Sequence, residues 1–256
     1  MSATGFLSYV NSQMAAGAYP TWNRPGAVRR AVTISRQAGC GALEIGEKLA
    51  ARLQARGPDH GCPWTVFDHN LMEKVLEDHR LPKYLATYLP EDRKPAMEEI
   101  LEDIFGLHPP ESTIIKQTAE TILGLAEMGN VILIGRGGNI ITAQVPHVLH
   151  VRIVAPLEQR IQHAHKTYGN SEVEARNFCL REDLGRERYV CKHFHADINN
   201  PLLYHLVINT GLMSYDAAAM LIEEALLSLQ TLPKNGAGPA APAHVAAQSA
   251  VAGAAH

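Results

Sequence analysis

The hydrophobic and polar positions of this chain follow two alternating patterns. The first is a set of short apolar runs rich in β-branched residues, at 31–35, 65–68, 130–135, 148–155 and 205–210. Such runs are typical of parallel strands that are covered on both faces. The second is a helical spacing of apolar residues, over 42–57, 70–79, 90–106, 112–129, 155–169, 171–194 and 214–230. Ser112 and Ser214 stand where N-cap residues are expected. The alternation predicts an α/β protein with helices on both faces of a parallel sheet.

Both ends of the chain lack these patterns. Residues 1–30 hold a short helical pattern followed by a linker that Pro and Gly interrupt. Residues 232–256 are an Ala, Gly and Pro tract that cannot bury enough apolar surface to offset its ordering entropy, so we predict a disordered tail. We therefore expect an N-terminal extension at 1–30, one domain at 31–231 and a tail at 232–256.

Composition limits the possible partners. The net charge of −3 argues against nonspecific nucleic-acid binding, which usually needs a basic surplus. No apolar run approaches the roughly 20 residues of a membrane span, and the first residues lack the pattern of a secretory signal. The cysteines have neither the spacing of a disulfide framework nor that of a zinc site, and we expect no metal site formed by protein side chains. We expect a cytoplasmic protein without nucleic-acid or membrane partners, and the oligomeric state stays open.

The first predicted strand ends at a glycine turn that suits an anion. Gly39 and Gly41 flank Cys40, and a predicted helix follows directly. Glycines let backbone N–H groups turn inward, and the helix N-terminus presents the positive end of its dipole. Taken alone, the turn could equally be a ligand-free connection. Cys40 could be a reactive thiol at a helix N-terminus or merely a small residue tolerated there.

Five ordered blocks of the sequence point to a family. They are AVTISRQAGCG (31–41), FDHNLMEKV (67–75), VILIGRGGNII (131–141), HVRIVAPLEQRI (150–161), and Asp183-x-x-Arg186-x-x-Tyr189 followed by NNPLLYHLVINTGLMS (199–214). Over residues 31–228 the chain resembles the cytidylate kinase-like family, relatives of the P-loop nucleoside monophosphate kinases. The resemblance implies a three-layer α/β/α P-loop kinase-like fold with a five-stranded parallel sheet and a helical lid. It also implies ATP and Mg²⁺ as cofactors and a nucleoside monophosphate, CMP above all, as the acceptor.

The resemblance further implies roles for residues that follow the strands. Arginine suits these roles because its planar fork meets phosphate oxygens in pairs, and phosphoryl transfer depends mostly on positioning and charge neutralisation. The implied ATP contacts are Arg36, Gly39, Cys40, Gly41, Ala42 and Asn209. The implied acceptor contacts are Asp68, Arg136, Arg181 and Arg188, and the residues implied in the transfer step are Arg136, Arg160, Asp183 and Arg186.

Simpler interpretations of the same residues stay open. Arg136 could be a surface arginine in a glycine-rich loop, and Asp68 could cap a helix that begins at Asn70. Asp183 could orient a lid arginine or pair with one at the surface. The arginines around it could form a solvated, salt-bridged helix face.

The phosphate loop departs from the usual GxxxxGK[ST] pattern. In register, Ala42 stands at the lysine position and Leu43 at the hydroxyl residue that holds Mg²⁺. After the third strand, Gly-Arg-Gly replaces the Gly-Arg-Asp of classical cytidylate kinases. In one hypothesis, Arg36, Lys48 or a lid arginine supplies the missing charge and the protein is a kinase. In a second, it binds nucleotide without catalysis as a regulatory or partner protein, and in a third it keeps only the fold.

Overall fold

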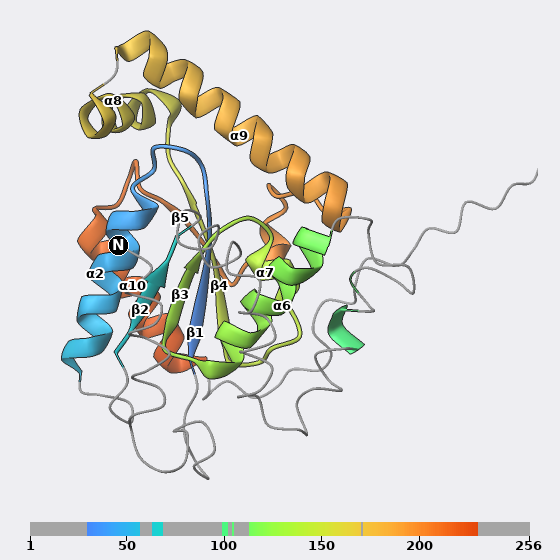
Figure 1. Ribbon diagram of the computed structural model, residues 1–256. Helices are drawn as coiled ribbons and strands as arrows, with labels where there is room; N and C mark the ends of the chain where they lie inside the picture. Colours follow the sequence, from blue (N-terminus) through green and yellow to red (C-terminus); the bar gives the residue numbers. More distant parts are fainter. Residues whose placement is uncertain are drawn as a thin grey trace, which may run out of the picture.

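The computed structural model describes residues 30–56, 63–68, 99–101, 104, 113–169 and 171–229. These residues form a five-stranded parallel sheet with helices on both faces, which confirms the predicted fold class (Figure 1). The predicted tail at 232–256, the extension at 1–30 except Arg30, the helix at 70–79 and most of the helix at 90–106 lie outside the described residues.

The sheet has the order β2-β3-β1-β4-β5, and each neighbouring pair is parallel. Its strands are β1 (Ala31–Arg36), β2 (Thr65–Phe67), β3 (Val131–Ile134), β4 (Val148–Val154) and β5 (Leu206–Asn209). Because all strands run the same way, their carboxyl ends meet at one edge. The chain crosses from one half of the sheet to the other between β3 and β4, which makes the end of the central strand β1 the topological switch point, where ligands of open α/β sheets bind.

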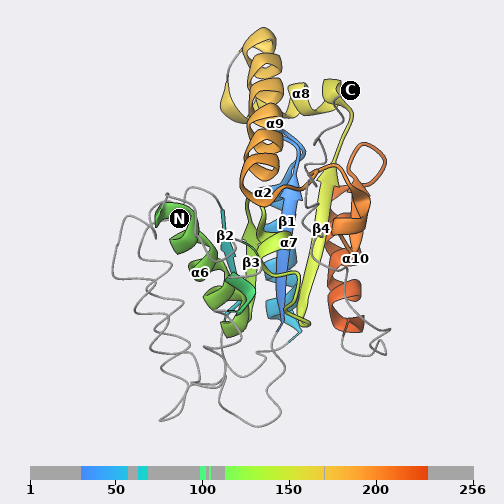
Figure 2. The ribbon, with the colours of Figure 1, turned by 90° about the vertical axis from the view of Figure 1, so that its right-hand side faces the viewer.

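The helices form a layer on each face and a hairpin beyond the carboxyl edge. One face is covered by α2 (Ala42–Ala55) and α10 (Tyr215–Ser228), and the other by α6 (Thr113–Met128) and the short α7 (Gly138–Ile141). The hairpin consists of α8 (Leu157–Tyr168) and α9 (Glu172–Phe194) and stands over the end of the sheet (Figures 1 and 2). A 3₁₀ turn, η3 (Pro201–Leu203), leads into β5. No helix in the described part of the chain is long and apolar enough to cross a membrane.

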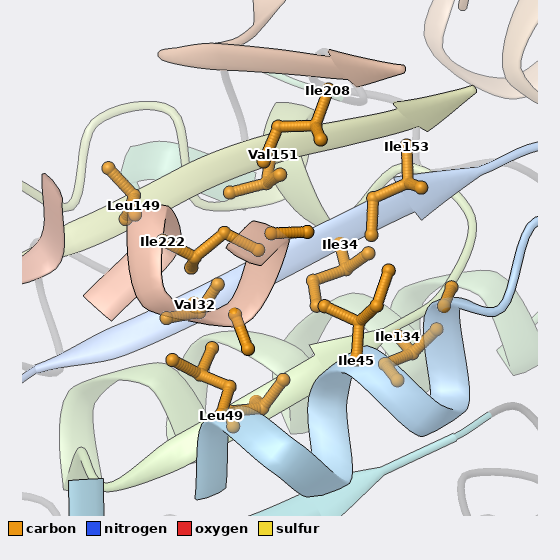
Figure 3. Close-up of a cluster of buried hydrophobic side chains, with 14 of the residues drawn as sticks. Val32, Ile34, Ile45, Leu49, Ile134, Leu149, Val151, Ile153, Ile208 and Ile222 are labelled. Carbon is orange, nitrogen blue, oxygen red and sulfur yellow. The ribbon is translucent and has the colours of Figure 1, made fainter. Parts of the chain in front are cut away.

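The core explains why the strands are apolar without alternation. Val32 and Ile34 of β1 pack against Ile45 and Leu49 of α2 and Ile222 of α10 (Figure 3). The opposite face of the sheet packs against α6 in a second buried cluster that contains Ala31, Val131, Val148 and Leu123. Apolar surface is therefore buried on both faces of the strands, and this burial is the dominant favourable term in folding.

Local signals set the helix ends. The Ser214 hydroxyl accepts a hydrogen bond from the Ala217 N–H at 3.2 Å, which confirms the predicted N-cap of α10. Ser171 and Glu174 form a reciprocal capping box at the start of α9. Ser112 lies outside the described residues. The sequence pattern did not predict α7, because a four-residue helix is too short to show a period.

Candidate functional site

The glycine turn at the end of β1 adopts a shape that only glycine suits. Gly39 and Gly41 have φ values of +76° and +77°, in the left-handed region. A Cβ atom on Gly39 would lie 2.4 Å from the Arg160 carbonyl oxygen, and one on Gly41 would lie 2.2 Å from the Tyr215 ring. Helix α2 begins directly after the turn, with Gly41 as its N-cap residue. The turn therefore places a helix N-terminus at the carboxyl edge of the sheet, as predicted.

Two side chains of the hairpin hold the turn by the backbone of Ala38. The Ala38 N–H donates to Oδ1 of Asp183 at 2.7 Å, and Nη1 of Arg160 donates to the Ala38 carbonyl oxygen at 3.1 Å. Arg160 Nη1 and Asp183 Oδ2 are 2.6 Å apart, and the Arg160 side chain is 7% exposed. Arg160 Nε also donates to the Ala155 carbonyl oxygen. We call this arrangement of Ala38, Arg160 and Asp183 the clasp, because it joins the turn to both α8 and α9.

Three arginines from different elements gather beside the turn. Arg36 ends β1, Arg136 follows β3 and Arg186 lies on α9; we call these three the arginine cluster. Each carries a buried N–H group without a hydrogen-bond partner, namely Nη1 of Arg36, Nε of Arg136 and Nε of Arg186. Buried charged donors are rarely left unpaired, and their desolvation costs several kcal/mol per ion unless a partner compensates it. The cluster is therefore chemically suited to an anion.

Electrostatic effects show that these groups act on one another. Burial lowers the pKa of Arg36 to about 10, and the positive charges of Arg186 and Arg136 add to that shift while Cys40 and Asp68 oppose it. Burial likewise lowers the pKa of Arg186. Arg36 still carries its proton at neutral pH, so the cluster keeps a positive charge that favours anionic ligands. The effect of Asp68 on Arg36 also places this carboxylate near the cluster.

Cys40 is a protonated thiol rather than a reactive one. Its side chain is buried between the two glycines, and burial raises its pKa to about 11 although Arg36 and the Ala42 N–H favour the thiolate. A thiol with that pKa is almost entirely protonated at neutral pH. The structure thus favours the interpretation of Cys40 as a small residue that the turn accommodates.

A family comparison adds to this geometry. The model described as the cytidylate kinase-like family matches residues 31–212. The chain belongs to the cytidylate kinase-like family. Its membership confirms the resemblance carried by the five blocks, and it makes the protein kinase-like in family, with the acceptor nucleotide left open.

A solved structure supports the fold of this cytidylate kinase-like chain. It is similar to an uncharacterized protein from Eubacterium ventriosum, at 19% identity and a TM-score of 0.59, over 78% of this chain and 99% of that one. It also matches a shikimate kinase from Bacteroides thetaiotaomicron at 10% identity and a TM-score of 0.43, over 77% of this chain and 98% of that one. The likeness to the Eubacterium ventriosum protein supports the fold alone. The shikimate kinase is too distant to support any conclusion about this chain.

A curated relative shares part of the sequence. A uronate isomerase from Corynebacterium glutamicum is 33% identical over 113 residues, which is 44% of this chain and 22% of that protein. The cytidylate kinase-like chain therefore spans about a fifth of the length of that relative.

The structure brings some of the residues with implied roles together and separates others. Arg36, Arg136 and Arg186 converge, whereas Arg181 and Arg188 lie on the exposed side of α9. Arg160 and Asp183 contact the backbone of the turn in this conformation. Their implied role in the transfer step stays a prediction.

Asn209 stands at the exposed end of β5, next to a residue that touches the turn. Its side-chain oxygen accepts a hydrogen bond from the Gly211 N–H at 2.9 Å. The Thr210 hydroxyl donates to the Cys40 carbonyl oxygen at 3.2 Å. This contact brings the end of β5 beside the turn, as the implied ATP site requires, whereas the side-chain oxygen of Asn209 bonds to Gly211.

Sequence reasoning did not assign two residues that touch the site. The Arg136 guanidinium lies 5.7 Å from the centre of the Tyr189 ring, within cation–π range. Tyr215 covers Gly41 from the start of α10. Tyr189 follows Asp183 and Arg186 at intervals of three residues, a spacing that puts all three on one side of a helix, and this signal was available in the sequence.

The implied cofactors fit the site unequally. The turn, the N-terminus of α2 and the arginine cluster offer N–H donors that suit nucleotide phosphates. For Mg²⁺ the two positions at the start of α2 offer no side-chain oxygen, because Ala42 and Leu43 are both apolar residues. Among the described residues no group of three or more His, Cys, Asp or Glu side chains could hold a metal ion. The described part of the loop therefore does not fit a metal held by protein side chains.

Proposed function

We propose that the protein transfers a phosphoryl group from ATP to a nucleoside monophosphate, with CMP as the acceptor to test first. The proposal is carried by the arginine cluster, whose three buried and unpartnered N–H groups lie beside a glycine turn at the carboxyl edge of the sheet. Membership of the cytidylate kinase-like family supports the same reaction class. We further propose that the protein acts in the cytoplasm on small-molecule nucleotides, without a nucleic-acid or membrane partner.

In this proposal, backbone N–H groups and guanidinium groups share the phosphates. The N–H groups of the turn and the first turn of α2 hold the phosphates of ATP, and Arg136 holds the acceptor phosphate. Arg36 and Arg186 neutralise the group in transfer, which needs positioning and charge rather than covalent chemistry. Mg²⁺ would accompany the nucleotide, neutralising phosphate charge with water as its other ligand.

The sequence offers Arg36, Lys48 or a lid arginine in place of the missing loop lysine, and two of these suit the role. Lys48 pairs with Asp216 at 2.7 Å on the surface between α2 and α10. Arg36 and Arg186 instead carry unpartnered N–H groups within the site. We therefore assign the role of the lysine to Arg36 and Arg186.

Nucleotide binding without transfer is the second candidate function. It is favoured by Ala42 and Leu43, which remove both working side chains of the loop. The clasp also commits Arg160 and Asp183 to the backbone of the turn. A protein of this kind would bind ATP tightly enough to measure and would release no ADP.

The test is an ADP-release assay with ATP, Mg²⁺ and each of CMP, UMP, dCMP and AMP, together with calorimetry of ATP binding. Arg186→Ala should lower kcat/KM by about 10²-fold or more, the usual effect of removing one charge-stabilising donor. Arg176→Ala is the matched control, because Arg176 lies on the same helix and pairs with the exposed Glu158. ATP binding without turnover would establish the second function, and absence of nucleotide binding would refute both.

A further inference from the structure

Glu182 is a carboxylate that stands inside the arginine cluster. Its Oε2 atom lies 3.9 Å from Nη2 of Arg136 and 3.3 Å from Nη2 of Arg186. One oxygen atom therefore bridges two arginines that come from different elements. Both separations exceed the 2.7–2.9 Å, approximately, of a strong charge-assisted hydrogen bond. The side chain is 26% exposed, so it borders solvent as well as the cluster.

The neighbouring carboxylate is held quite differently. Asp183 accepts hydrogen bonds of 2.7 Å from the Ala38 N–H and 2.6 Å from Arg160, both within the clasp. Asp183 is thus fixed to the backbone of the turn, and its Oδ1 atom also lies 3.4 Å from Nη1 of Arg186. Glu182 makes only the longer contacts, and a rotation of its side chain would release it to water without breaking the clasp.

Glu182 also leaves the cluster unsatisfied. Nε of Arg136, Nε of Arg186 and Nη1 of Arg36 remain buried without a partner while the carboxylate is in place. A phosphoryl group carries three peripheral oxygens and a charge near −2 at pH 8, so it can meet more of these donors than a carboxylate can.

We propose that Glu182 is an internal competitor for the anion site, which a ligand must displace, and that it selects dianionic phosphoryl groups over monoanions. When a monoanion replaces Glu182, the negative charge within the cluster stays the same. When a dianion replaces it, the cluster holds one more negative charge. If Glu182 stayed in place, the ligand would face a like charge at close range, which is costly in a partly buried site. The inference rests on the proposed function only in taking the ligand group to be a phosphoryl group.

The experiment measures anion affinity rather than turnover. Binding of inorganic pyrophosphate to the full chain is followed by calorimetry at pH 8 in low salt. Methyl phosphate, a dianion, and dimethyl phosphate, a monoanion, are then tested as competitors. Glu182→Gln should bind pyrophosphate about tenfold tighter than the wild type, because two weak and partly exposed ion pairs no longer have to be broken. Dimethyl phosphate should compete measurably only with the variant.

The matched control is Glu187→Gln, which removes the same charge from the same helix. Glu187 is exposed and accepts a hydrogen bond from Asn199 at 3.1 Å, a bond that the glutamine oxygen can also accept. Its pyrophosphate affinity should stay within about twofold of the wild type, since its charge is screened by solvent. Glu182→Asp keeps the charge on a shorter side chain and should fall between the wild type and Glu182→Gln, which covers the case in which the glutamine variant fails to fold.

The direction of the change in pyrophosphate affinity distinguishes the possible roles of Glu182. Unchanged or weaker pyrophosphate binding by Glu182→Gln would overturn the proposal, because it would make Glu182 a bystander or a support for the arginines. Tighter binding in a protein that transfers no phosphoryl group would refute the proposed kinase function and leave this inference standing. Phosphoryl transfer combined with an unchanged pyrophosphate affinity of Glu182→Gln would support the proposed kinase function and refute this inference.

Discussion

Replacing Gly39 with alanine tests whether the hairpin fixes the shape of the turn. Gly39 and Gly169 both have left-handed backbone conformations, with φ values of +76° and +68°. They differ in their surroundings. An added Cβ atom meets the Arg160 carbonyl oxygen at 2.4 Å in the first case and nothing within 4 Å in the second. Gly169→Ala therefore reports the backbone cost alone, and Gly39→Ala reports that cost plus the collision.

The magnitudes follow from these two contributions. A left-handed conformation costs a residue with a Cβ atom about 1–2 kcal/mol, which applies to both variants. At Gly39, unlike at Gly169, the added Cβ atom would meet the backbone of α8, which cannot rotate away as a flexible side chain would. Overpacking of that kind costs roughly 1–3 kcal/mol more. We expect Gly39→Ala to be destabilised by about 2 kcal/mol beyond Gly169→Ala.

Thermal unfolding of both variants checks the difference. For a protein of this size, about 2 kcal/mol corresponds to a further decrease of roughly 4–8 °C in Tm. Pyrophosphate affinity should also fall in Gly39→Ala and stay unchanged in Gly169→Ala, because only the first change displaces the turn. Equal decreases in Tm for the two variants would refute the reasoning, since they would show that α8 moves aside freely.

Two further predictions concern buried titratable groups. Burial, with a smaller contribution from His205, lowers the pKa of His150 from 6.5 to about 3, so the folded protein holds this ring neutral. The stability that depends on the neutral ring is complete above pH 6.5 and is lost as the pH falls towards 3, by up to about 1.4 kcal/mol per pH unit. Urea unfolding between pH 7.5 and 5 should show this slope and His150→Asn should flatten it, whereas an equal slope in the variant would assign the effect to other groups. Iodoacetamide at pH 7.5 should label the exposed Cys191 of the native protein and spare the buried Cys40, with its pKa of about 11; peptide mass mapping checks this, and rapid native labelling of Cys40 would contradict it.

The fold could be predicted from the sequence because its signals are local. The apolar run at 130–135 and the glycines at 39 and 41 each restrict the backbone without reference to distant residues. The same holds for the N-cap at Ser214. The five apolar runs gave the number of strands, and the resemblance of the five blocks then gave the implied roles of the residues that follow the strands.

The details of the site depend on packing that local patterns do not contain. A helical projection separates Arg186 from Arg181 and Arg188, but the inward face of α9 is lined by residues such as Ala175 and Cys179, whose apolar signal is weak. The sequence therefore did not show which arginines point to the turn. The clasp is beyond local reasoning as well, because Ala38 and Asp183 are separated by 145 positions in the chain.

The clasp has a consequence for protein engineering. The shape of the turn is set from outside, by side chains of α8 and α9 that grip one peptide unit, and not by the residues at its catalytic positions. Leu43, which is exposed, can then be exchanged with little effect on the path of the backbone, whereas Ala42 is buried in the core at the start of α2 and has less room for a longer side chain. A serine introduced at position 43 would enter a turn that is already formed, so the rebuilding of a GxxxxGK[ST] loop would start there.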